Sequence, residues 1–472
     1  MDGPLHVVVV GAGIGGLGSA LAFSRSGHRV TLVERDDTPM PVDVEGAFEW
    51  DRRGAPQVRH PHAFLGLGRT ILRDRFPDVL QALTDNGVHT VSVLDAPFID
   101  PSVSATLAAD DDLLALGCRR TTFEWVLRRC VLAEANVELR VGTGVAGVVA
   151  TGTPPTVTGA RMEDGTIIEA DLVVVSTGRR SGATAWLAEH GVDVPEERSD
   201  AGVVYFSRFY RADKDNSFGF RVGLGAGVAA GVIGADAGTY SITAVVDKHD
   251  RELRAHLTDS DRFDATMRLM PDLADVIEFG GTPIHPAHCM AGLINRLRRY
   301  TDADGNPLAI GLLAVGDAHT CTNPAYGRGQ SLALLQATMA ADAVAANDDL
   351  ESAARQYEAD SAARVQPWYH LSVLTDQLRP ALPGRGARNG SGRGDVAGLD
   401  LFGALSAASG DPELLHLASR VLHLLETPQA LWARLPDLQR AAAEAPPRLP
   451  RRRGRPRVHR PSRDEILAVG AR

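Results

Sequence analysis

The chain has 472 residues, of which 44% are hydrophobic and 23% are charged, and its formal net charge is −10. This length exceeds one ordinary hydrophobic core, so we expect a globular protein with two or more domains. The acidic balance argues against nucleic acid as a partner. Four scattered cysteines without a Cys-x-x-Cys pair indicate neither a disulfide framework nor a zinc site.

No segment of the sequence predicts a membrane span. The least polar stretch, residues 222–235, is rich in glycine and falls short of the ~18 apolar residues that a spanning helix needs. The first residues carry no basic leader before the first apolar run. We therefore expect a cytoplasmic protein.

The first predicted element is a strand, tight turn and helix at the start of the chain. An apolar run at 7–10 predicts a buried strand, and the box Gly11-Ala-Gly-Ile-Gly-Gly16 follows it directly before a helical stretch at 17–24. In such a unit Gly13 lets the backbone approach a pyrophosphate, and the free N–H groups of the helix start face the anion. The pattern predicts dinucleotide binding, but alone it does not separate NAD from FAD.

A second strand predicted at 29–33 ends at Glu34, whose carboxylate can accept hydrogen bonds from an adenosine ribose. The polar, proline-spaced residues 43–62 then predict a loop able to reach over the cofactor. Helices are predicted over 70–86 and 121–135.

The middle of the chain predicts strands. Short β-branched runs between 137 and 175 predict a small antiparallel layer that returns to the main sheet at 172–175. Residues 200–247 alternate apolar and polar side chains, which predicts an antiparallel sheet on the substrate side.

A second glycine box identifies the nucleotide. The apolar run at 309–315 predicts a last parallel strand, and it leads into Gly316-Asp317 and then Asn323-Pro-Ala-Tyr-Gly-Arg-Gly329 before a helix at 332–346. Asp317 at the carboxyl edge of the sheet can bond a ribityl hydroxyl, and the start of the following helix favours the negative charge of a reduced flavin ring. The two boxes together predict FAD.

The last hundred residues predict a different organisation. Residues 376–395 have the composition of a linker, and 396–445 predict a helical region with helices near 412–426 and 428–443. The tail at 446–472 is dense in arginine and proline and predicts disorder.

These elements predict an α/β fold in which a Rossmann-like FAD-binding domain, with a mixed or parallel sheet, is interleaved with an antiparallel-sheet substrate domain and followed by a helical C-terminal extension. The FAD-binding domain is predicted at 1–72, 105–182 and 296–375. The substrate-binding domain is predicted at 73–104 and 183–295.

At these motifs the chain resembles the group A flavoprotein monooxygenases of the para-hydroxybenzoate hydroxylase type, and within them it is similar to bacterial polyether epoxidases. The stretches that carry the resemblance lie in order before residue 345, at 7–34, 52–62, 120–125, 171–181, 202–205, 295–296 and 313–329. The resemblance implies that FAD is held by Gly11, Gly13, Gly16, Glu34, Arg35, Arg120 and Asp317, with Pro324, Gly327 and Gly329 beside the flavin ring. Gly15, Val145 and Gly316 complete the predicted cofactor site.

One position departs from the family pattern. Most hydroxylases of this group carry Asp-Gly in the middle motif, a carboxylate tied to the NAD(P)H and flavin sites, whereas this chain has Thr177-Gly178. The epoxidase-like branch tolerates the change, so FAD binding is still expected. The source of electrons stays open between NAD(P)H acting directly and a partner flavin reductase.

His62 and Tyr326 are the catalytic candidates, as side chains that line the pocket. His60 and His62 flank a proline in the predicted loop, and one of them lines the oxygen-reaction pocket, or both only bond backbone carbonyls. Tyr326, with Tyr205 and Phe206, either covers the flavin or belongs to the core. No metal site is expected, because the pair His285 and His288 lacks a third ligand nearby.

The resemblance implies an FAD-dependent monooxygenase. O2 would react with the reduced cofactor to give a flavin C4a-hydroperoxide, which epoxidises or hydroxylates an apolar secondary metabolite, such as a polyketide, terpenoid or aromatic compound. A flavin dehydrogenase or reductase without oxygen insertion would share every cofactor feature, and a non-catalytic flavin-binding partner protein is the third alternative. The Trp-x-Trp-x-Ile-Pro motif of flavin halogenases is absent, which favours oxygenation over halogenation.

Overall fold

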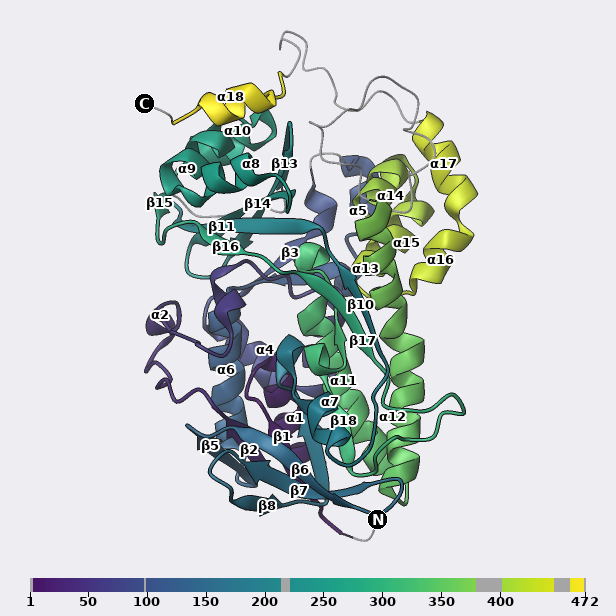
Figure 1. Cartoon of the computed structure of the whole chain (residues 1–472). Coiled ribbons are helices and arrows are strands. Elements are labelled where there is room, and N and C mark those ends of the chain that lie inside the picture. Colours follow the sequence, from purple (N-terminus) through teal and green to yellow (C-terminus); the bar gives the residue numbers. More distant parts are fainter. Residues whose placement is uncertain (1–2, 97–98, 214–220, 379–400, 445–458, 471–472) are drawn as a thin grey trace.

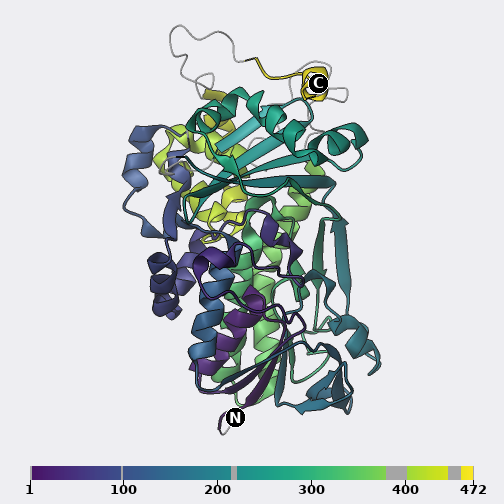
Figure 2. The same cartoon turned by 90° about the vertical axis from the view of Figure 1, so that its left-hand side faces the viewer.

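The computed structural model describes residues 3–96, 99–213, 221–378, 401–444 and 459–470. A parallel sheet with its helices and an antiparallel sheet with its helices lie at opposite ends of the molecule, and a group of C-terminal helices lies beside them (Figure 1 and Figure 2). Among the described residues, no helix combines the length and the apolar character needed to cross a bilayer.

The main sheet has five parallel strands in the order β18-β9-β1-β2-β5. Their bounds are β1 His6–Val10, β2 Arg29–Glu34, β5 Val137–Val141, β9 Leu172–Val175 and β18 Leu312–Ala314. Strands from the start, middle and late part of the chain thus lie side by side. The prediction that 137–141 belongs to the antiparallel layer is wrong, because β5 pairs in parallel with β2 as an edge strand of the main sheet. Its residues Val137 and Leu139 pack on the large core.

Both faces of this sheet are covered, which explains its continuous apolar runs. Val7 and Val9 of β1 pack against helices, whereas Val8 and Val10 pack against a small sheet. The helices are α1 Ile14–Arg25, α6 Arg120–Ala133, α11 Arg328–Ala346 and α12 Leu350–Arg364. The opposite face carries the antiparallel strands β6 Val145–Thr151, β7 Thr156–Met162 and β8 Ile167–Glu169, together with α7 Ala183–Ala188.

The segment predicted as one helix over 70–86 forms two helices, α3 Gly66–Arg75 and α4 Pro77–Asp85. The break falls at Phe76 because proline disfavours a helical residue before it and itself begins a new helix. Apolar side chains of α4 and of α5 Pro101–Leu107 pack in the large core with α1 and α11. The predicted domain boundaries stay a prediction, and this packing favours joining 73–104 to the FAD-binding part.

The prediction of antiparallel structure over 200–247 is confirmed for the described residues, and residues 214–220 lie outside them. The sheet has the order β12-β13-β14-β11-β15, with β16 also paired to β11. Its strands are β11 Val203–Arg211, β12 Arg221–Gly225, β13 Val228–Ala235, β14 Thr239–Asp247, β15 Thr282–Pro283 and β16 His288–Met290. One face is covered by α8 Arg251–Thr258, α9 Ser260–Arg268 and α10 Ala274–Phe279.

A narrow sheet connects the two ends of the molecule (Figure 1). It consists of β10 Glu196–Asp200, β17 Ile294–Arg298 and β19 Thr320–Cys321. A separate hairpin pairs β3 His89–Ser92 with β4 Leu114–Gly117. The loop that was predicted over 43–62 contains only α2 Val44–Ala47 and a single 3-10 turn, Pro56–Arg59.

The described part of the predicted helical region 396–445 is helical, with α14 Leu401–Ala407, α15 Pro412–Leu422, α16 Pro428–Ala433 and α17 Leu435–Glu444. Two further helices, α13 Gln366–Leu378 and α18 Arg463–Ala468, lie outside that predicted region. The predicted helix over 428–443 is divided at Arg434, just before Pro436. Most of the predicted linker lies outside the described residues.

The predicted disordered tail needs a correction. Residues 459–470 are ordered and contain α18, because Ile466 is fully buried against the antiparallel sheet and its helices and Arg463 pairs with Asp250 at 2.9 Å. Residues 445–458 lie outside the described part of the chain. Residues 459–470 therefore dock on the antiparallel sheet and its helices.

Candidate functional site

The first glycine box forms an open turn at the carboxyl edge of the main sheet. A Cβ at Gly16 would overlap the carbonyl oxygen of Gly11, so only glycine allows this close approach. At Gly13 the nearest atom to a hypothetical Cβ is Nη2 of Arg120, at 3.9 Å, so the surface of the turn is free. No side chain caps the N-terminus of α1. Open backbone, a helix start and a guanidinium group together favour an anion.

Glu34 ends β2 and is held in one orientation. Its Oε2 accepts a hydrogen bond from the N–H of Ala12 at 3.0 Å, and its Oε1 accepts one from the N–H of Asp36 at 2.9 Å. Each carboxylate oxygen can accept a second donor. The side chain is 8% exposed, so a bound ribose could reach it from the open side.

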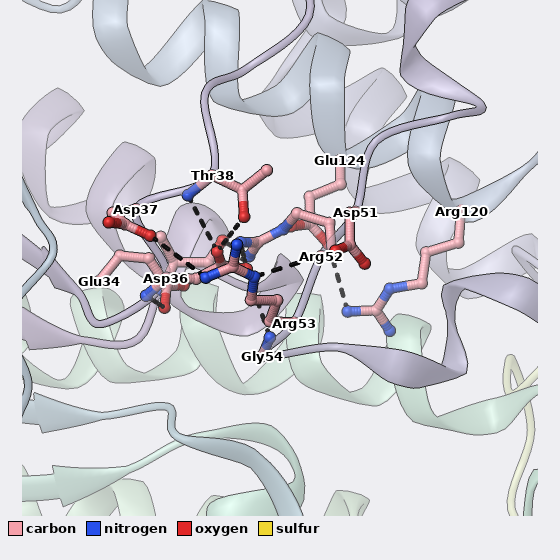
Figure 3. A network of polar contacts seen from close by, with 11 residues as sticks. Glu34, Asp36, Asp37, Thr38, Asp51, Arg52, Arg53, Gly54, Arg120 and Glu124 are labelled. Carbon is pink, nitrogen blue, oxygen red and sulfur yellow. Dashed lines mark hydrogen bonds and ion pairs between the residues drawn. The ribbon is translucent and has the colours of Figure 1, made fainter.

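Arg52 lies at the centre of a buried ionic network around Glu34 (Figure 3). It contacts Glu124 at 2.6 Å, Asp36 at 2.8 Å and Glu34 at 3.3 Å. Burial lowers the pKa of Arg52, but the charges of Glu124, Glu34 and Asp36 outweigh it and raise this pKa above its ordinary value. Arg52 therefore fixes the position of the predicted ribose-binding carboxylate.

Arg120 extends from the start of α6 toward the glycine turn. Its Nη2 lies 3.3 Å from Oε2 of Glu124, and its buried Nε has no hydrogen-bond partner among the described residues. The preceding Arg119 fixes the helix start, because its main-chain N–H and its guanidinium both bond the fully buried Asp236. Arg120 thus has an unmet donor beside Gly13.

Arg35 lies farther along the same edge, where it lines a cavity of about 210 Å³ with Asp36, Asp37, Arg53 and Gly54. The connection from β5 to β6 is also at this end, because a Cβ at Gly142 would lie 3.5 Å from Cβ of Asp37. Val145, the first residue of β6, follows that connection. This arrangement keeps Arg35 near the adenosine end of the predicted site, and Val145 lies in the same region of the fold.

The second glycine box forms a turn, Gly316–Ala318, that the rest of the fold holds from two sides. The N–H of Gly316 donates to Oε1 of Gln336 at 2.9 Å. Arg298 donates to the carbonyl oxygens of Asp317 at 3.3 Å and Ala318 at 2.8 Å. These bonds fix the backbone of the turn that carries Asp317.

The carboxyl of Asp317 lies in the second turn, and burial raises its pKa. The positive charges of Arg120, Arg179 and Arg298 and a hydrogen bond with Cys321 oppose the shift. Among the described residues the carboxylate has no ion-pair partner. A Cβ at Gly15 would lie 3.5 Å from Cγ1 of Val315, just before the second turn. The structure therefore brings the two boxes together at one edge of the sheet.

The segment Pro324–Gly329 completes this edge. Pro324–Tyr326 form a 3-10 turn, and Gly327 then takes a left-handed conformation with φ 66°. A Cβ at Gly327 would overlap Cβ of Ala63, so this glycine lets the turn pack on the loop at 52–63. A Cβ at Gly329 would lie 3.9 Å from Oδ1 of Asp317.

The loop histidines adopt two different environments. Nδ1 of His62 donates to the carbonyl oxygen of His60 at 2.9 Å, which leaves Nε2 as an acceptor. Burial and the charge of Arg120 hold the pKa of His62 well below its ordinary value. His60 is hydrogen-bonded to Oγ of Ser207 at 2.8 Å, and burial lowers its pKa to about 4. Both imidazoles are neutral near pH 7.

The aromatic candidates separate onto two faces of β11. Phe206 packs with the helices on the far face, which agrees with the alternative that it belongs to the core. Tyr205 points the other way, and its hydroxyl donates to Oδ1 of Asn323 at 2.8 Å. Tyr326 lies under the guanidinium of Arg328, 4.5 Å from its ring centre.

His285 and His288 lie beside the same loop. Nε2 of His285 is 3.2 Å from Nη1 of Arg59, and the ring of His285 stacks on Phe48. Within the described part of the chain, no three His, Cys, Asp or Glu side chains are grouped to hold a metal ion.

Sequence reasoning did not assign roles to several of the residues that build the site. Arg52 was noticed only as part of a motif, and its partners Asp36 and Glu124 are supplied by the fold. Arg298 was likewise missed, although it follows the noted pair Asn295-Arg296 closely. A run of arginines before the second box was the only available signal.

The residues present fit FAD. The open turn at Gly13 and the unpaired Nε of Arg120 call for an anion, which a pyrophosphate supplies. The carboxylate of Asp317 calls for donors, which ribityl hydroxyls supply. Glu34, with acceptor capacity remaining, stands at the ribose position between them and the adenosine end.

Comparison with known proteins agrees with this fit. Residues 6–40, which contain the first glycine box, match the family model DAO, FAD dependent oxidoreductase. Over 369 residues the chain is 28% identical to Protein Rv3254 of Mycobacterium tuberculosis, which covers 70% of this chain and 71% of that protein.

Solved structures of flavin enzymes have a similar fold. PqsL, a probable FAD-dependent monooxygenase from Pseudomonas aeruginosa, aligns with a TM-score of 0.58 at 17% identity over 88% of this chain and 99% of PqsL. A structure of PqsL in complex with 2-aminobenzoylacetate aligns equally well, with a TM-score of 0.58. The flavin-dependent brominase Bmp2 aligns with a TM-score of 0.62 at 16% identity over 92% of this chain and 99% of Bmp2. These structural alignments show a shared fold. The closer likeness to polyether epoxidases stays a prediction.

Proposed function

We propose that the protein is an FAD-dependent monooxygenase that epoxidises or hydroxylates an apolar small molecule. The observation that carries this proposal is the convergence of the two glycine boxes, in which Arg120 lies beside Gly13 and its charge acts on the buried carboxyl of Asp317. The match of residues 6–40 to an FAD dependent oxidoreductase model and the shared fold of PqsL support it.

Each predicted residue has a distinct task in this proposal. Gly13, the start of α1 and Arg120 hold the pyrophosphate, Glu34 holds the adenosine ribose, and Asp317 holds the ribityl chain. The segment Pro324–Gly329 lies beside the ring. Bound FAD supplies the redox chemistry, taking electrons from NAD(P)H directly or through a flavin reductase and activating O2.

The antiparallel sheet supplies a wall for the substrate. Along β13, Val228, Ala230 and Val232 are buried against the helices, whereas the alternate residues Ala229 and Gly231 are only partly buried. The alternate face is the one that carries Ser207 on β11, and Ser207 contacts His60 of the loop. Small, incompletely covered residues on this face leave room for a bulky apolar molecule.

A polar edge completes the wall. Ser207 is hydrogen-bonded to both His60 and Thr243, each at 2.8 Å. His62 presents a neutral acceptor nitrogen beside Arg120, so it can orient a hydroxyl or N–H group of the substrate without adding charge. We therefore assign pocket-lining roles to His62 and Tyr326.

The substrate class follows from this wall. An apolar secondary metabolite with at least one hydrogen-bonding group suits it, and a polyketide, terpenoid or aromatic compound meets that description. The binding of 2-aminobenzoylacetate by PqsL supports a small-molecule substrate. A cytoplasmic enzyme of secondary metabolism is the setting that we propose.

Product mass separates the monooxygenase from a flavin dehydrogenase or reductase, which would use the same cofactor residues. The purified protein is loaded with FAD, and oxidation of NADH and NADPH is followed with candidate substrates under ¹⁸O2, with an added flavin reductase in a parallel series. A product that gains one labelled oxygen atom is expected. A product that only gains or loses two hydrogens contradicts oxygen insertion.

A further inference from the structure

Helix α13 contacts residues on either side of the Pro324–Tyr326 turn. It packs on β17 and β19, between the second glycine box and the C-terminal helices. Trp368, Ser372 and Asp376 are spaced four residues apart, so they lie on one face of α13. That face bonds Asn323, which precedes the turn, and Arg328, which lies two residues after it.

The contact before the turn is a cluster of buried amides around Asp376. One carboxylate oxygen accepts from Nδ2 of Asn323 at 2.7 Å, and the other accepts from Nδ2 of Asn295 at 2.8 Å. Oδ1 of Asn295 in turn accepts from the N–H of Asn323 at 2.7 Å. Asn295 is fully buried and Asn323 is 2% exposed.

This cluster determines the direction of the Asn323 amide. Because Asp376 accepts only, it holds both Nδ2 groups toward itself and turns Oδ1 of Asn323 toward the turn. That oxygen accepts from the hydroxyl of Tyr205 at 2.8 Å and from the N–H of Ala325 at 3.3 Å. Asp376 thus acts on the turn through Asn323.

The contact after the turn is made through Arg328. This side chain is fully buried, donates from Nη1 to Oγ of Ser372 at 2.7 Å, and lies over the rings of Tyr326 and Trp368 at 4.5 and 5.4 Å. Both ends of the turn are therefore held by one helix face.

We propose that Trp368, Ser372 and Asp376 form a clamp that positions the Pro324–Tyr326 turn, with Asp376 as its main positioning residue. The function of the clamp rests on the proposed flavin enzyme, in which this turn lies beside the ring. A carboxylate is required at 376, because an amide there would direct a donor at Nδ2 of either Asn295 or Asn323.

The FAD-free protein gives the first test, by hydrogen–deuterium exchange of the peptide that covers residues 320–332. Asp376→Asn should speed exchange there by about tenfold, the effect of losing one buried hydrogen-bonded group. Ser372→Ala should act on the same peptide more weakly. Asp360→Asn is the matched control, because the single hydrogen bond that Asp360 makes among the described residues is to the exposed Gln356, and it should change nothing.

The FAD-loaded protein gives the second test. Asp376→Asn should shift the visible flavin absorption and lower the fraction of reducing equivalents that appears in product, whereas Asp360→Asn should leave both unchanged. Unaltered exchange at 320–332 in both clamp variants overturns the clamp, and Ser372→Ala decides the matter if Asp376→Asn does not fold. Failure of the wild type to take up FAD overturns the proposed function instead, since the exchange result does not depend on FAD.

Discussion

Replacing Arg52 by methionine should destabilise the protein strongly at neutral pH. The guanidinium is 3% exposed and contacts three carboxylates, Glu34, Asp36 and Glu124, at 2.6 to 3.3 Å. Removing one partner of a buried ion pair costs about 3–5 kcal/mol, because it leaves charge buried without compensation. Glu34 and Asp36 keep main-chain donors, from Ala12 and Thr38, so we expect a value within this range.

The assay is thermal unfolding of the FAD-free protein. For a chain of this length the unfolding entropy is roughly 1 kcal/mol/K, so the expected fall in Tm is about 3–5 °C. Arg53→Met is the matched control: the neighbouring Arg53 is 73% exposed and its ion pairs with Asp37 and Asp51 are 3.9 Å long. Its substitution should cost less than about 1 kcal/mol.

The loss at Arg52 should also depend on pH. Burial alone would raise the pKa of Asp36. Hydrogen bonds from Thr38 and Gly54 and the charge of Arg52 outweigh this effect, so the pKa lies below its ordinary value of 3.8. The stabilisation is therefore complete above that value and is lost as pH falls through the lower folded pKa. Without Arg52 the buried carboxylates take up protons at higher pH, so the deficit should shrink between pH 7 and pH 5. Equal Tm changes for Arg52→Met and Arg53→Met, at every pH, would refute the reasoning.

Two further predictions concern a glycine and a histidine. Gly16→Ala should lower the Tm of the FAD-free protein, because its Cβ overlaps the carbonyl oxygen of Gly11. Gly13→Ala should leave that Tm unchanged and weaken FAD binding. A colourless Gly13→Ala variant whose Tm is also lowered would contradict this prediction. Burial lowers the pKa of His423 to about 4. The unfolded chain therefore binds more protons than the folded chain between about pH 6.5 and pH 4. The free energy of unfolding should fall by roughly 3 kcal/mol as pH falls through this window. His423→Gln should flatten this dependence of Tm on pH, while the half-buried His416→Gln should not; parallel profiles for wild type and His423→Gln would count against the buried neutral imidazole.

The local patterns of the sequence were sufficient for the parts of the fold that depend on neighbouring residues. The apolar run before Gly11 and the one before Gly316 each predict a parallel strand and a turn, and the antiparallel alternation over 200–247 is equally local. The alternation also separates Tyr205 from Phe206, since adjacent strand residues point to opposite faces. It does not reveal which face meets the helices.

Other features depend on partners far apart in the sequence. Arg52 meets Glu124 across 72 positions, and Asp376 meets Asn295 across 81. No periodicity identifies such pairs, because the fold alone brings them together. The helix α18 was different: Ser462 and Glu465 form a capping box that is visible in the sequence, and the dense arginines before it obscured that signal.

Titration of the purified protein with FAD, followed by visible absorbance, tests most directly whether the two glycine boxes hold one cofactor. We expect one FAD bound per chain in the wild type and an affinity about tenfold or more lower in Asp317→Ala, which loses hydrogen bonds to a charged acceptor. A wild-type protein that retains no FAD once the excess is removed, or an affinity that Asp317→Ala leaves unchanged, would contradict the site.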